Sequence, residues 1–521
     1  MPLSDKLSRR DFLRLSAFGA ATLFTAPILN SCSFLKQPPD LEIALQAVQG
    51  EVPILPGKTT RVWTYQGQVT KGDPASLQTL PGSYLGPILR VRKGQRVRIT
   101  FTNNLPELSI VHWHGLHVPD DMDGHPRFAI GPGQTYVYEF QVLNRAGTYW
   151  FHPHPDKLTG PQVYKGMTGL FLVSDDEETA AGLPSGEFDI PLIIQDRTFD
   201  ADNQLSYLPV GTNDTIMGFL GERILVNGQP DFVLPVATRP YRLRLLNGSN
   251  SRVYKLGWQD GTPLTVIAAD GGLLEKPLQR SYVTLAPAER VELWVDFSGR
   301  AVGSELRLQS LTFNGIACAG VGMFGGCPLP KVPVGAELTL LRVRVERQSA
   351  EKQPLPERLS TITRHKLADA VNREKPRTFT IGIQEQPPFW HINGRSFEME
   401  GVAADETVKL NTLEVWEFIN KPGTMTMGTL TMTSETAHPI HIHGQQFQII
   451  ERKVRPDKAA DWGTVSAGFV DEGWKDTVLV MPGETVRLLR KFEDYAGLYL
   501  YHCHNLEHED LGMMRNYRIT G

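Results

Sequence analysis

Cysteine is scarce in this sequence: four residues occur among 521, too few for a fold held together by many disulfides. A large charge of one sign is also lacking, because 53 basic and 57 acidic residues leave a net charge of −4. After the first 36 residues, no stretch has the roughly 20 apolar residues that a membrane-spanning helix needs. We therefore expect a mature protein that is soluble or tethered only by a lipid, without nucleic acid or an anionic membrane as a partner.

Glycine and proline, in contrast, are plentiful, with 48 and 37 residues, which suits a chain with many turns between short strands. Charged residues make up 21 % and hydrophobic residues 41 % of the sequence, as is usual for a globular protein. The length exceeds what one hydrophobic core supports. At roughly 150 residues per domain it indicates three domains.

Residues 1–37 have the pattern of a targeting segment. Two adjacent arginines in Ser8-Arg9-Arg10-Asp11-Phe12-Leu13-Arg14 precede a weakly apolar run, Leu15–Leu29, that is too short and too polar to span a bilayer. The pattern resembles a twin-arginine signal, so we expect export to the periplasm or out of the cell. A basic amphipathic helix is the alternative. Leu29-Asn30-Ser31-Cys32 resembles a lipoprotein cleavage box, which leaves open a lipid anchor on Cys32 or a plain signal peptide.

Cys318 and Cys327 lie in a glycine-rich loop, Ile316–Pro328. In the oxidising compartment that export implies, a disulfide between them is the expected outcome. A soft-metal site formed by both thiols and Met323 is the alternative.

Strands are predicted along the whole chain, because side chains alternate or are β-branched and aromatic, with little helical periodicity. Loops rich in proline, glycine, asparagine and aspartate separate the strands. The predicted strands are Val91–Phe101, Tyr136–Phe140, Tyr241–Leu246, Val291–Phe297, Val415–Ile419 and Val486–Phe492.

Two blocks of sequence recur three times at intervals of roughly 150 to 170 residues, which indicates three homologous domains. Short strands separated by turns predict an all-β fold of antiparallel β-sandwiches. We expect domains at residues 38–180, 181–347 and 377–521, with 348–376 as a linker rich in charged residues and proline. The first block is Gly94–Asn103, Arg239–Asn247 and Thr412–Asn420, and the second is Gly133–Phe140, Ala288–Val295 and Gly483–Arg490.

The first and third repeats carry histidine pairs that the second lacks. On a strand, residues i and i+2 point to the same face with Cα atoms about 6.6 Å apart, so both imidazoles of a pair can reach one metal cluster. A single His-x-His is more often two core histidines, but four pairs at matching positions predict a cluster with eight imidazole nitrogens at a domain interface. The pairs are His112-Trp113-His114, His152-Pro153-His154, His441-Ile442-His443 and His502-Cys503-His504.

Cys503 lies between His502 and His504, so its thiol projects from the opposite face of the strand. His438 and His508 are the histidines left to join it there. Two imidazoles, one thiolate and a weak axial thioether form a blue-copper electron-transfer site, and Met513, five residues after His508, is placed to be that thioether. Copper is favoured over zinc because zinc has no redox role.

These segments together resemble the multicopper oxidases (laccases, copper efflux oxidases and bilirubin oxidases) along nearly all of the mature length. The resemblance rests on His112-Trp-His-Gly115, His152-Pro-His154, His438-Pro-Ile-His-Ile-His-Gly444 and His502-Cys-His-x3-His508-x4-Met513. It implies three consecutive cupredoxin-like Greek-key β-sandwich domains. It also implies four copper ions, three of them in a cluster between the first and third domains.

The resemblance further implies a role for each ligand. The type 1 copper would be held by His438, Cys503, His508 and Met513, and the type 2 copper by His112 and His441. The type 3 pair would be held by His114, His152, His154, His443, His502 and His504. The other four histidines are expected to be structural: His117, His125, His365 and His391.

Reduction of O2 consumes protons, so acidic groups are expected near the cluster. By resemblance, Glu507 and Asp123 match the proton-delivering carboxylates of the family. The alternatives are a glutamate exposed to solvent and an aspartate that only shapes a Met-Asp-Gly bend. Spacing alone does not decide between them.

The resemblance implies O2 and a small-molecule reductant as partners, and we expect a monomer. Copper efflux oxidases carry a methionine-rich insert and an Asp-Met-Met run before the first type 1 histidine, where this chain has Glu435-Thr436-Ala437. Its nearby methionines, Met425, Met427 and Met432, are few and alternate with threonine, which favours core positions on a strand over a path for Cu(I). We therefore expect phenols and aromatic amines as reductants, with Cu(I) as the alternative. A second alternative, a copper-binding or envelope protein without turnover, is disfavoured by the complete ligand set.

Overall fold

The computed structural model describes residues 38–209, 214, 217–319, 330–384, 390–421, 423–427 and 430–521. The predicted targeting segment, residues 1–37 with Cys32, lies outside the described residues. Cys327, one half of the predicted disulfide, lies outside them as well. Among the described residues, no helix combines the length and the apolar character needed to cross a membrane.

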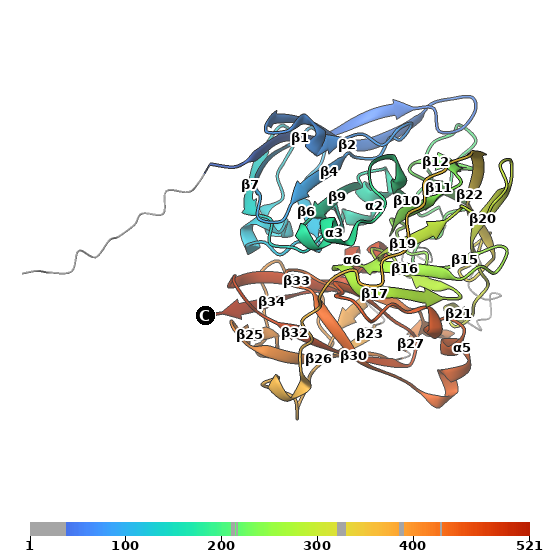
Figure 1. Ribbon diagram of the computed structural model, residues 1–521. Helices are drawn as coiled ribbons and strands as arrows, with labels where there is room; N and C mark the ends of the chain where they lie inside the picture. Colours follow the sequence, from blue (N-terminus) through green and yellow to red (C-terminus); the bar gives the residue numbers. More distant parts are fainter. Residues whose placement is uncertain are drawn as a thin grey trace, which may run out of the picture. The chain divides into compact units, whose positions relative to one another are not determined.

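The prediction of an all-β fold is confirmed, since strands dominate and helices are short (Figure 1). The strands of the first repeat are β1 (Leu41–Val52), β2 (Thr60–Lys71), β3 (Leu77–Gln78), β4 (Ile88–Arg92), β5 (Arg96–Asn103), β6 (Val111–His114), β7 (Thr135–Gln141), β8 (Gly147–Pro153) and β9 (Gly169–Ser174). Those of the second are β10 (Asp189–Arg197), β11 (Arg223–Val226), β12 (Gln229–Pro230), β13 (Val233–Ala237), β14 (Pro240–Asn247), β15 (Tyr254–Trp258), β16 (Leu264–Ala269), β17 (Gly272–Arg280), β18 (Val283–Leu285), β19 (Arg290–Asp296), β20 (Glu305–Ser310) and β22 (Leu338–Arg347).

The third repeat and the connections complete the described elements. The strands of the third repeat are β23 (Arg377–Ile383), β24 (Trp390–Ile392), β25 (Thr407–Lys409), β26 (Leu413–Asn420), β29 (His438–Ile442), β30 (Phe447–Val454), β31 (Thr477–Val480), β32 (Glu484–Lys491), β33 (Gly497–Cys503) and β34 (Met514–Thr520). Three further strands form a small separate sheet, namely β21 (Ala317–Ala319), β27 (Gly423–Met427) and β28 (Leu430–Glu435). The helices are α2 (Thr159–Tyr164), α3 (Asp176–Ala181), α5 (Ala459–Gly463) and α6 (Leu506–Asp510). Single 3-10 turns lie at Pro74–Ser76, Asp120–Met122, Pro126–Phe128, Gly186–Phe188, Leu367–Asp369, Ala404–Glu406, Pro456–Lys458 and Ser466–Gly468.

The three repeats share one strand order. Each repeat has two sheets. In the first, second and third repeats, one sheet has the order β2-β1-β5-β7, β11-β10-β14-β19 and β24-β23-β26-β32, respectively, and the middle pair of each order is parallel. The other sheet of each repeat contains β4-β9-β8-β6, β13-β22-β20-β15 and β25-β34-β33-β29, in the same order of repeats. The colours of Figure 1 separate the repeats as blue to cyan, green to yellow, and orange to red. The predicted domain boundaries themselves stay a prediction.

The two recurring sequence blocks pair with each other in every repeat. β5 pairs with β7, β14 with β19 and β26 with β32, all antiparallel. The predicted strand Val91–Phe101 is wrong in one respect: it is two strands, β4 and β5, separated by a turn at Gly94. Gly94 has a φ of 88°, a conformation that favours glycine, so this residue ends the first strand.

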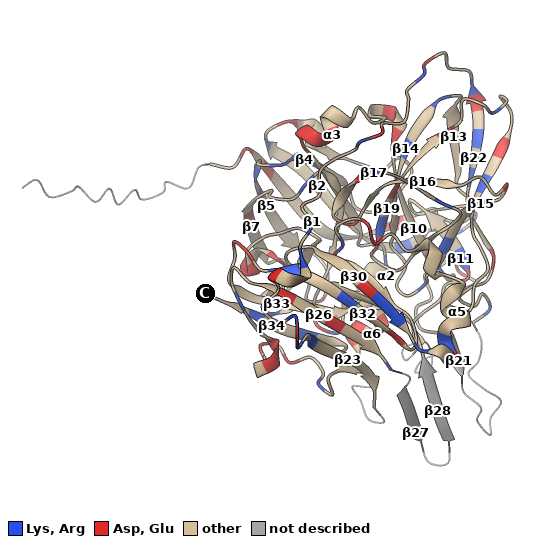
Figure 2. Ribbon diagram, turned by 60° about the horizontal axis from the view of Figure 1, so that its bottom comes forward, with Lys and Arg blue, Asp and Glu red and all other residues tan. Residues whose placement is uncertain are grey.

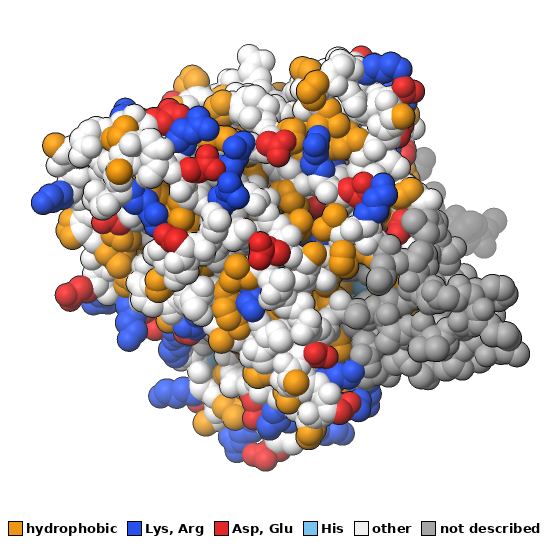
Figure 3. Space-filling view, turned by 90° about the vertical axis from the view of Figure 1, so that its right-hand side faces the viewer, with side chains coloured by type: hydrophobic (Ala, Val, Ile, Leu, Met, Phe, Trp, Pro, Cys, Tyr) orange, Lys and Arg blue, Asp and Glu red, His pale blue; other side chains and the backbone are white. Residues whose placement is uncertain are grey.

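Each repeat has its own hydrophobic core, and the surface is mixed. Trp113 and Phe151 are fully buried in the core of the first repeat, and Cys503 is fully buried in that of the third. Basic and acidic residues are interspersed along the ribbon in Figure 2, and hydrophobic side chains lie in small groups among charged ones on the face in Figure 3. The described part of that face thus shows no large block of one charge.

Candidate metal centre

The four histidine pairs lie on equivalent strands of the first and third repeats. β6 pairs with β8, which sets His112 opposite His152, and β29 pairs with β33, which sets His441 opposite His502. The corresponding strands of the second repeat, β15 and β20, pair Leu256 with Ser310. Only the first and third repeats therefore carry imidazoles on this pair of strands.

The two sets of pairs face each other between the first and third repeats. The ring of His112 stacks on that of His443, with ring centroids 3.8 Å apart, and His114 stacks on His441 at 3.7 Å. All eight histidines are buried. Strand alternation explains the arrangement, because Trp113 and Cys503 point into the hydrophobic cores while their neighbours point into the shared space.

The hydrogen bonds of these histidines determine which ring nitrogen is available. In four rings Nδ1 meets a backbone carbonyl, which can only accept, so Nδ1 carries the proton and Nε2 keeps its lone pair. The four contacts are His112 with Asp123 O at 2.6 Å, His152 with Pro153 O at 2.8 Å, His441 with Asp476 O at 2.8 Å, and His502 with Cys503 O at 3.1 Å. His443 Nδ1 lies 2.7 Å from the carboxylate oxygen Oδ2 of Asp123.

The Nε2 atoms point at one another. His112 Nε2 lies 3.3 Å from His441 Nε2. His502 Nε2 lies 3.1 Å from His443 Nε2 and 3.3 Å from His154 Nε2. Lone pairs at these distances repel unless a cation lies between them, and metal–imidazole bonds of about 2.0–2.1 Å would span such gaps.

Other ring nitrogens support the same interpretation. Among the eight histidines of the four pairs, five buried ring nitrogens have no hydrogen-bond partner: His114 Nδ1, His152 Nε2, His154 Nδ1, and both nitrogens of His504. A buried polar atom without a partner is costly. The residues present therefore fit a group of metal ions better than a hydrogen-bonded core.

The thiol of Cys503 meets two imidazoles on the other face of β33. Its Sγ lies 3.5 Å from His438 Nδ1 and 3.7 Å from His508 Nδ1, and the two nitrogens are 3.2 Å apart. All three side chains are buried. Three donors at these separations can surround one ion with bonds of roughly 2.0–2.3 Å.

Met513 is fully buried in the same core cluster as Cys503. Its backbone N–H donates to His508 O (2.9 Å) and its carbonyl accepts from Cys503 N (3.0 Å), so it is tied to both residues. Met514, the next residue, pairs in register with His502 and so faces the histidine cluster rather than Cys503. Met513 therefore lies next to both residues, and its role as a ligand stays a prediction.

The structure places the two predicted carboxylates differently. Asp123 lies at the cluster, 2.7 Å from His443 Nδ1 and 3.5 Å from His112 Nδ1, and burial raises its pKa well above the usual value. Glu507 instead accepts hydrogen bonds from Tyr207 Oη (2.7 Å), Asn250 Nδ2 (2.9 Å), Phe219 N (3.1 Å) and Ser251 Oγ. All four donors lie between strands β10 and β15 of the second repeat.

Glu509 occupies the place that we predicted for Glu507. Its carboxylate lies 3.0 Å from His502 Nδ1 and 3.6 Å from His154 Nε2, and it is buried. Both glutamates lie on helix α6. Residues two positions apart on a helix point in directions about 200° apart. The helix therefore decides which one faces the cluster, and only the periodicity of a helix over Leu506–Asp510 could have indicated this from sequence.

A third buried carboxylate in contact with the cluster, Asp476, was not predicted. Its Oδ1 lies 3.1 Å from His114 Nε2, and its side chain is fully buried. Two of the histidines expected to be structural bond elsewhere, since His117 Nε2 lies 2.9 Å from Asp494 and His125 Nε2 lies 2.8 Å from Asn516 Oδ1.

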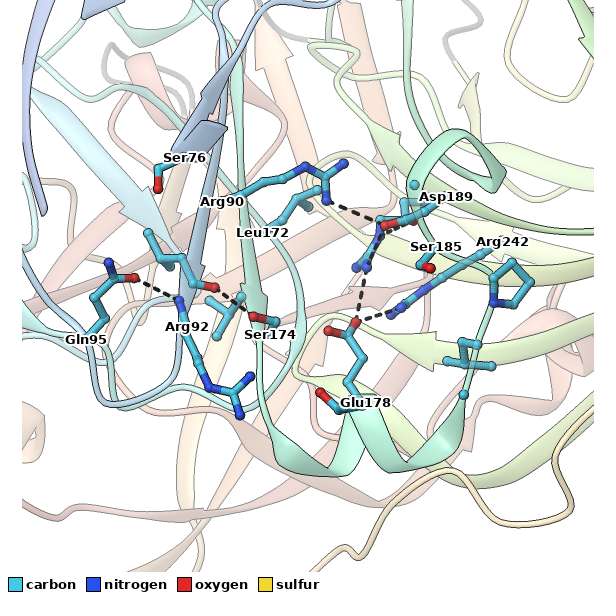
Figure 4. A pocket seen from close by; sticks show the side chains of 18 of the residues that line it. Ser76, Arg90, Arg92, Gln95, Leu172, Ser174, Glu178, Ser185, Asp189 and Arg242 are labelled. Atoms are coloured by element: carbon cyan, nitrogen blue, oxygen red, sulfur yellow. Dashed lines mark hydrogen bonds and ion pairs between the residues drawn. The ribbon is translucent and has the colours of Figure 1, made fainter. Parts of the chain in front are cut away.

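A pocket of about 610 Å³ lies apart from both donor sets (Figure 4). Its lining includes arginines from the first and second repeats, which point toward acidic partners. Arg90 lies 3.5 Å from Asp189, and Arg242 lies 2.6 Å from Glu178. Because these charges are paired and the lining includes no histidine, the pocket does not belong to the metal centre.

Comparison with known proteins gives consistent matches. Family models described as multicopper oxidase match residues 61–178 and 370–520. A multicopper oxidase of Staphylococcus aureus is 32 % identical over 450 residues, covering 86 % of this chain and 85 % of the relative. The laccase of Bacillus subtilis is 30 % identical, covering 86 % and 91 %, and a cell division protein FtsP of Shigella dysenteriae is 31 % identical, covering 91 % and 90 %. The crystal structure of a multicopper oxidase from Aquifex aeolicus aligns with a TM-score of 0.75 at 32 % identity, covering 93 % of this chain and 97 % of that one.

We expect the metal-free protein to lose stability as the pH falls from about 7.5 to about 5. Burial lowers the pKa of His152 and His438 to about 3 in the folded state, whereas unfolded histidines titrate near 6.5. Below about pH 6.5 the unfolded chain therefore binds more protons, and each such histidine costs about 1.4 kcal/mol per pH unit. Urea unfolding across this range measures the slope. His438→Gln should reduce this slope by the contribution of one histidine, about 1.4 kcal/mol per pH unit. A free energy of unfolding that stays constant or rises toward pH 5 would contradict the burial of neutral imidazoles.

Proposed function

The chain belongs to the multicopper oxidase family, with the all-β fold of cupredoxin-like domains, and we propose that it couples one-electron oxidation of phenols and aromatic amines to reduction of O2. Four phenols would each lose one electron and one proton, and one O2 would become two water molecules. The observation that carries the proposal is the pair of buried donor sets joined through Cys503.

Bound copper would supply the one-electron redox chemistry at the Cys503 set and the four-electron reduction of O2 at the histidine cluster. The Cys503 set would hold one ion through His438, Cys503 and His508, with Met513 as a weaker fourth donor. The cluster divides into His112 with His441, then His154 with His443 and His502, and finally His114 with His152 and His504. The close Nε2 contacts within the first two groups and the unpartnered nitrogens of the third support this division into three ions.

Cys503 connects the two sites covalently. Its thiol faces one donor set, and its chain neighbours His502 and His504 belong to the other. An electron taken up at the thiol therefore needs to pass only through one residue of backbone to reach an imidazole of the cluster. The complete donor set also favours an oxidase over a protein of the same fold without turnover, although some relatives are named cell division protein FtsP.

Asp123 and Glu509 are placed to hold protons for O2 reduction. Asp123 contacts His443 and His112 on one side of the cluster, and Glu509 contacts His502 and His154 on another. The contacts favour Glu509 over Glu507, because Glu507 is engaged by four donors near the second repeat. Glu507 is better suited to fixing helix α6, which carries His508.

Phenols and aromatic amines are favoured by the similarity to a laccase and by the small number of methionines near His438. One observation favours Cu(I) as the second candidate. In the hairpin of β27 and β28, Met425 is paired with Met432, and Met427 lies two residues further along its strand. This register brings methionine positions of the two strands together, which is the reason to test Cu(I) as a reductant.

O2 uptake by the copper-loaded protein tests the proposal. We expect rapid uptake with a phenol at four electrons per O2, slower uptake with Cu(I), and none by Cys503→Ser with either reductant. Uptake with Cu(I) alone that falls in the double variant Met425→Leu/Met432→Leu would favour the second candidate. No uptake with either reductant would indicate copper binding without turnover.

Replacing Met513 by Leu should raise the redox potential of the Cys503 site. A thioether stabilises Cu(II) slightly more than Cu(I), and its loss shifts a one-electron couple by about 59 mV for each 1.4 kcal/mol. Leucine has a similar volume, so the packing cost should stay below about 1.5 kcal/mol. Met514→Leu is the matched control, because Met514 faces His502. In a potentiometric titration, a shift for Met514→Leu and none for Met513→Leu would move the axial assignment by one residue.

Replacing Glu509 by Gln should slow O2 reduction by about 100-fold, the usual range for loss of a general acid. Anaerobic bleaching of the blue colour by the reductant should remain fast, since the Cys503 site is unchanged. Glu507→Gln should lower the unfolding temperature, because one carboxylate oxygen that accepts hydrogen bonds is lost, but should keep turnover. Stopped-flow measurement of both half-reactions, oxidation of the reductant and reduction of O2, distinguishes the two glutamates. Slow O2 reduction in Glu507→Gln but not in Glu509→Gln would show that Glu507 is the proton donor.

A further inference from the structure

Arg290, at the start of β19 in the second repeat, has all five of its N–H groups engaged in the protein interior. Nε donates to Thr148 O (2.9 Å), Nη1 to Ala288 O (3.0 Å) and Nη2 to Asp270 O (2.9 Å). The remaining two bonds form a parallel pair to the carboxylate of Asp476, at 2.7 and 2.5 Å. Its side chain is fully buried.

The acceptors of Arg290 come from all three repeats. Thr148 lies on β8 of the first repeat, the strand that also carries His152. Asp270 and Ala288 belong to the second repeat, and Asp476 directly precedes β31 of the third. A single guanidinium thus joins the three parts of the chain at one point behind the histidine cluster.

Asp476, held by Arg290, contacts two histidines of the cluster. Its Oδ1 lies 3.1 Å from His114 Nε2, so that His114 donates its proton there and keeps its Nδ1 lone pair for a metal. Its backbone carbonyl accepts from His441 Nδ1 at 2.8 Å, which leaves Nε2 of that ring available. One residue therefore fixes the orientation of two imidazoles.

The space around the Asp476 carboxylate leaves it little freedom. Gly115, directly after His114, has a φ of 86°, and a side-chain carbon there would collide with Asp476 Oδ2. Lys475, its chain neighbour, donates to Asp270 (2.8 Å) and Glu289 (2.9 Å) of the second repeat. The segment that carries Asp476 is consequently held by the second repeat on both sides.

We propose that Arg290 is a positioning residue for the histidine cluster, through which the repeat that lacks metal-ligand histidines sets the orientation of His114 and His441. The proposal rests on the proposed function for the identity of the metal. Two parallel N–H bonds fix the plane of the Asp476 carboxylate, and three bonds to backbone carbonyls hold the guanidinium itself in place. A lysine cannot replace this arrangement, because it has three donors and no fork. Arg290 itself would not touch O2 or the reductant.

The test compares Arg290→Lys with Arg242→Lys in the copper-loaded protein. Arg242 is a matched control: it is also buried on the second repeat, and its partners are Glu178 and Glu292 rather than a carboxylate at the cluster. We expect Arg290→Lys to alter the Cu(II) EPR hyperfine splitting of the His112 and His441 site, and to lower turnover about 10- to 100-fold. The KM for the reductant and the blue absorption of the Cys503 site should stay as in the wild type. Arg242→Lys should leave all four quantities unchanged.

Equal EPR spectra and turnover in the two variants would overturn the proposal. If Arg290→Lys does not accumulate as folded protein, Asp476→Asn replaces it, because the amide keeps the shape of the carboxylate but loses its charge. The same EPR change is expected, and a wild-type spectrum would overturn the proposal. A wild-type protein that binds copper but takes up no O2 would contradict the proposed function alone, because the EPR comparison still tests the positioning by Arg290.

Discussion

Eight buried imidazoles share one space between the first and third repeats, and the arrangement of the rest of the chain follows from keeping them neutral and correctly oriented. Burial lowers the pKa of these rings wherever a shift is resolved, so they present lone pairs rather than protons. Nitrogens that face each other at 3.1–3.3 Å then repel. Bound cations remove this repulsion, and without them the protein must hold the rings in place by their outer nitrogens alone.

Those outer contacts use backbone carbonyls more than side chains. His112, His152, His441 and His502 all donate to carbonyl oxygens, which belong to the backbone and cannot rotate away as side chains can. The same strands place Cys503 and Trp113 in the hydrophobic cores on their other face. The β-sandwich therefore supplies rigidity, ring orientation and the division between two donor sets through one property, the alternation of side chains along a strand.

The second repeat illustrates how duplicated domains divide their roles. Its strand order is that of its neighbours, but Leu256 and Ser310 stand where the others carry histidines. It contributes instead the ion pair from Arg290 to Asp476 behind the cluster, and residues near its start and within it bind Glu507 on the helix of His508. Both contacts reach the side of a donor set that faces away from the metal positions.

The sequence by itself determined the all-β class, the threefold repetition and the residues that form the donor sets, because these depend on periodicity and spacing over a few neighbours. The face opposite the His-x-His pairs, where Cys503 points, followed from the period of two of a strand. Only the tertiary structure decided which nitrogen of each ring is available, since that depends on carbonyls such as Asp476 O, 35 residues from His441. It also decided that Glu509 rather than Glu507 faces the cluster, because the two residues point in directions about 200° apart on helix α6. The Arg290–Asp476 pair joins residues 186 positions apart, and no local pattern encodes a contact that exists only where two repeats pack together.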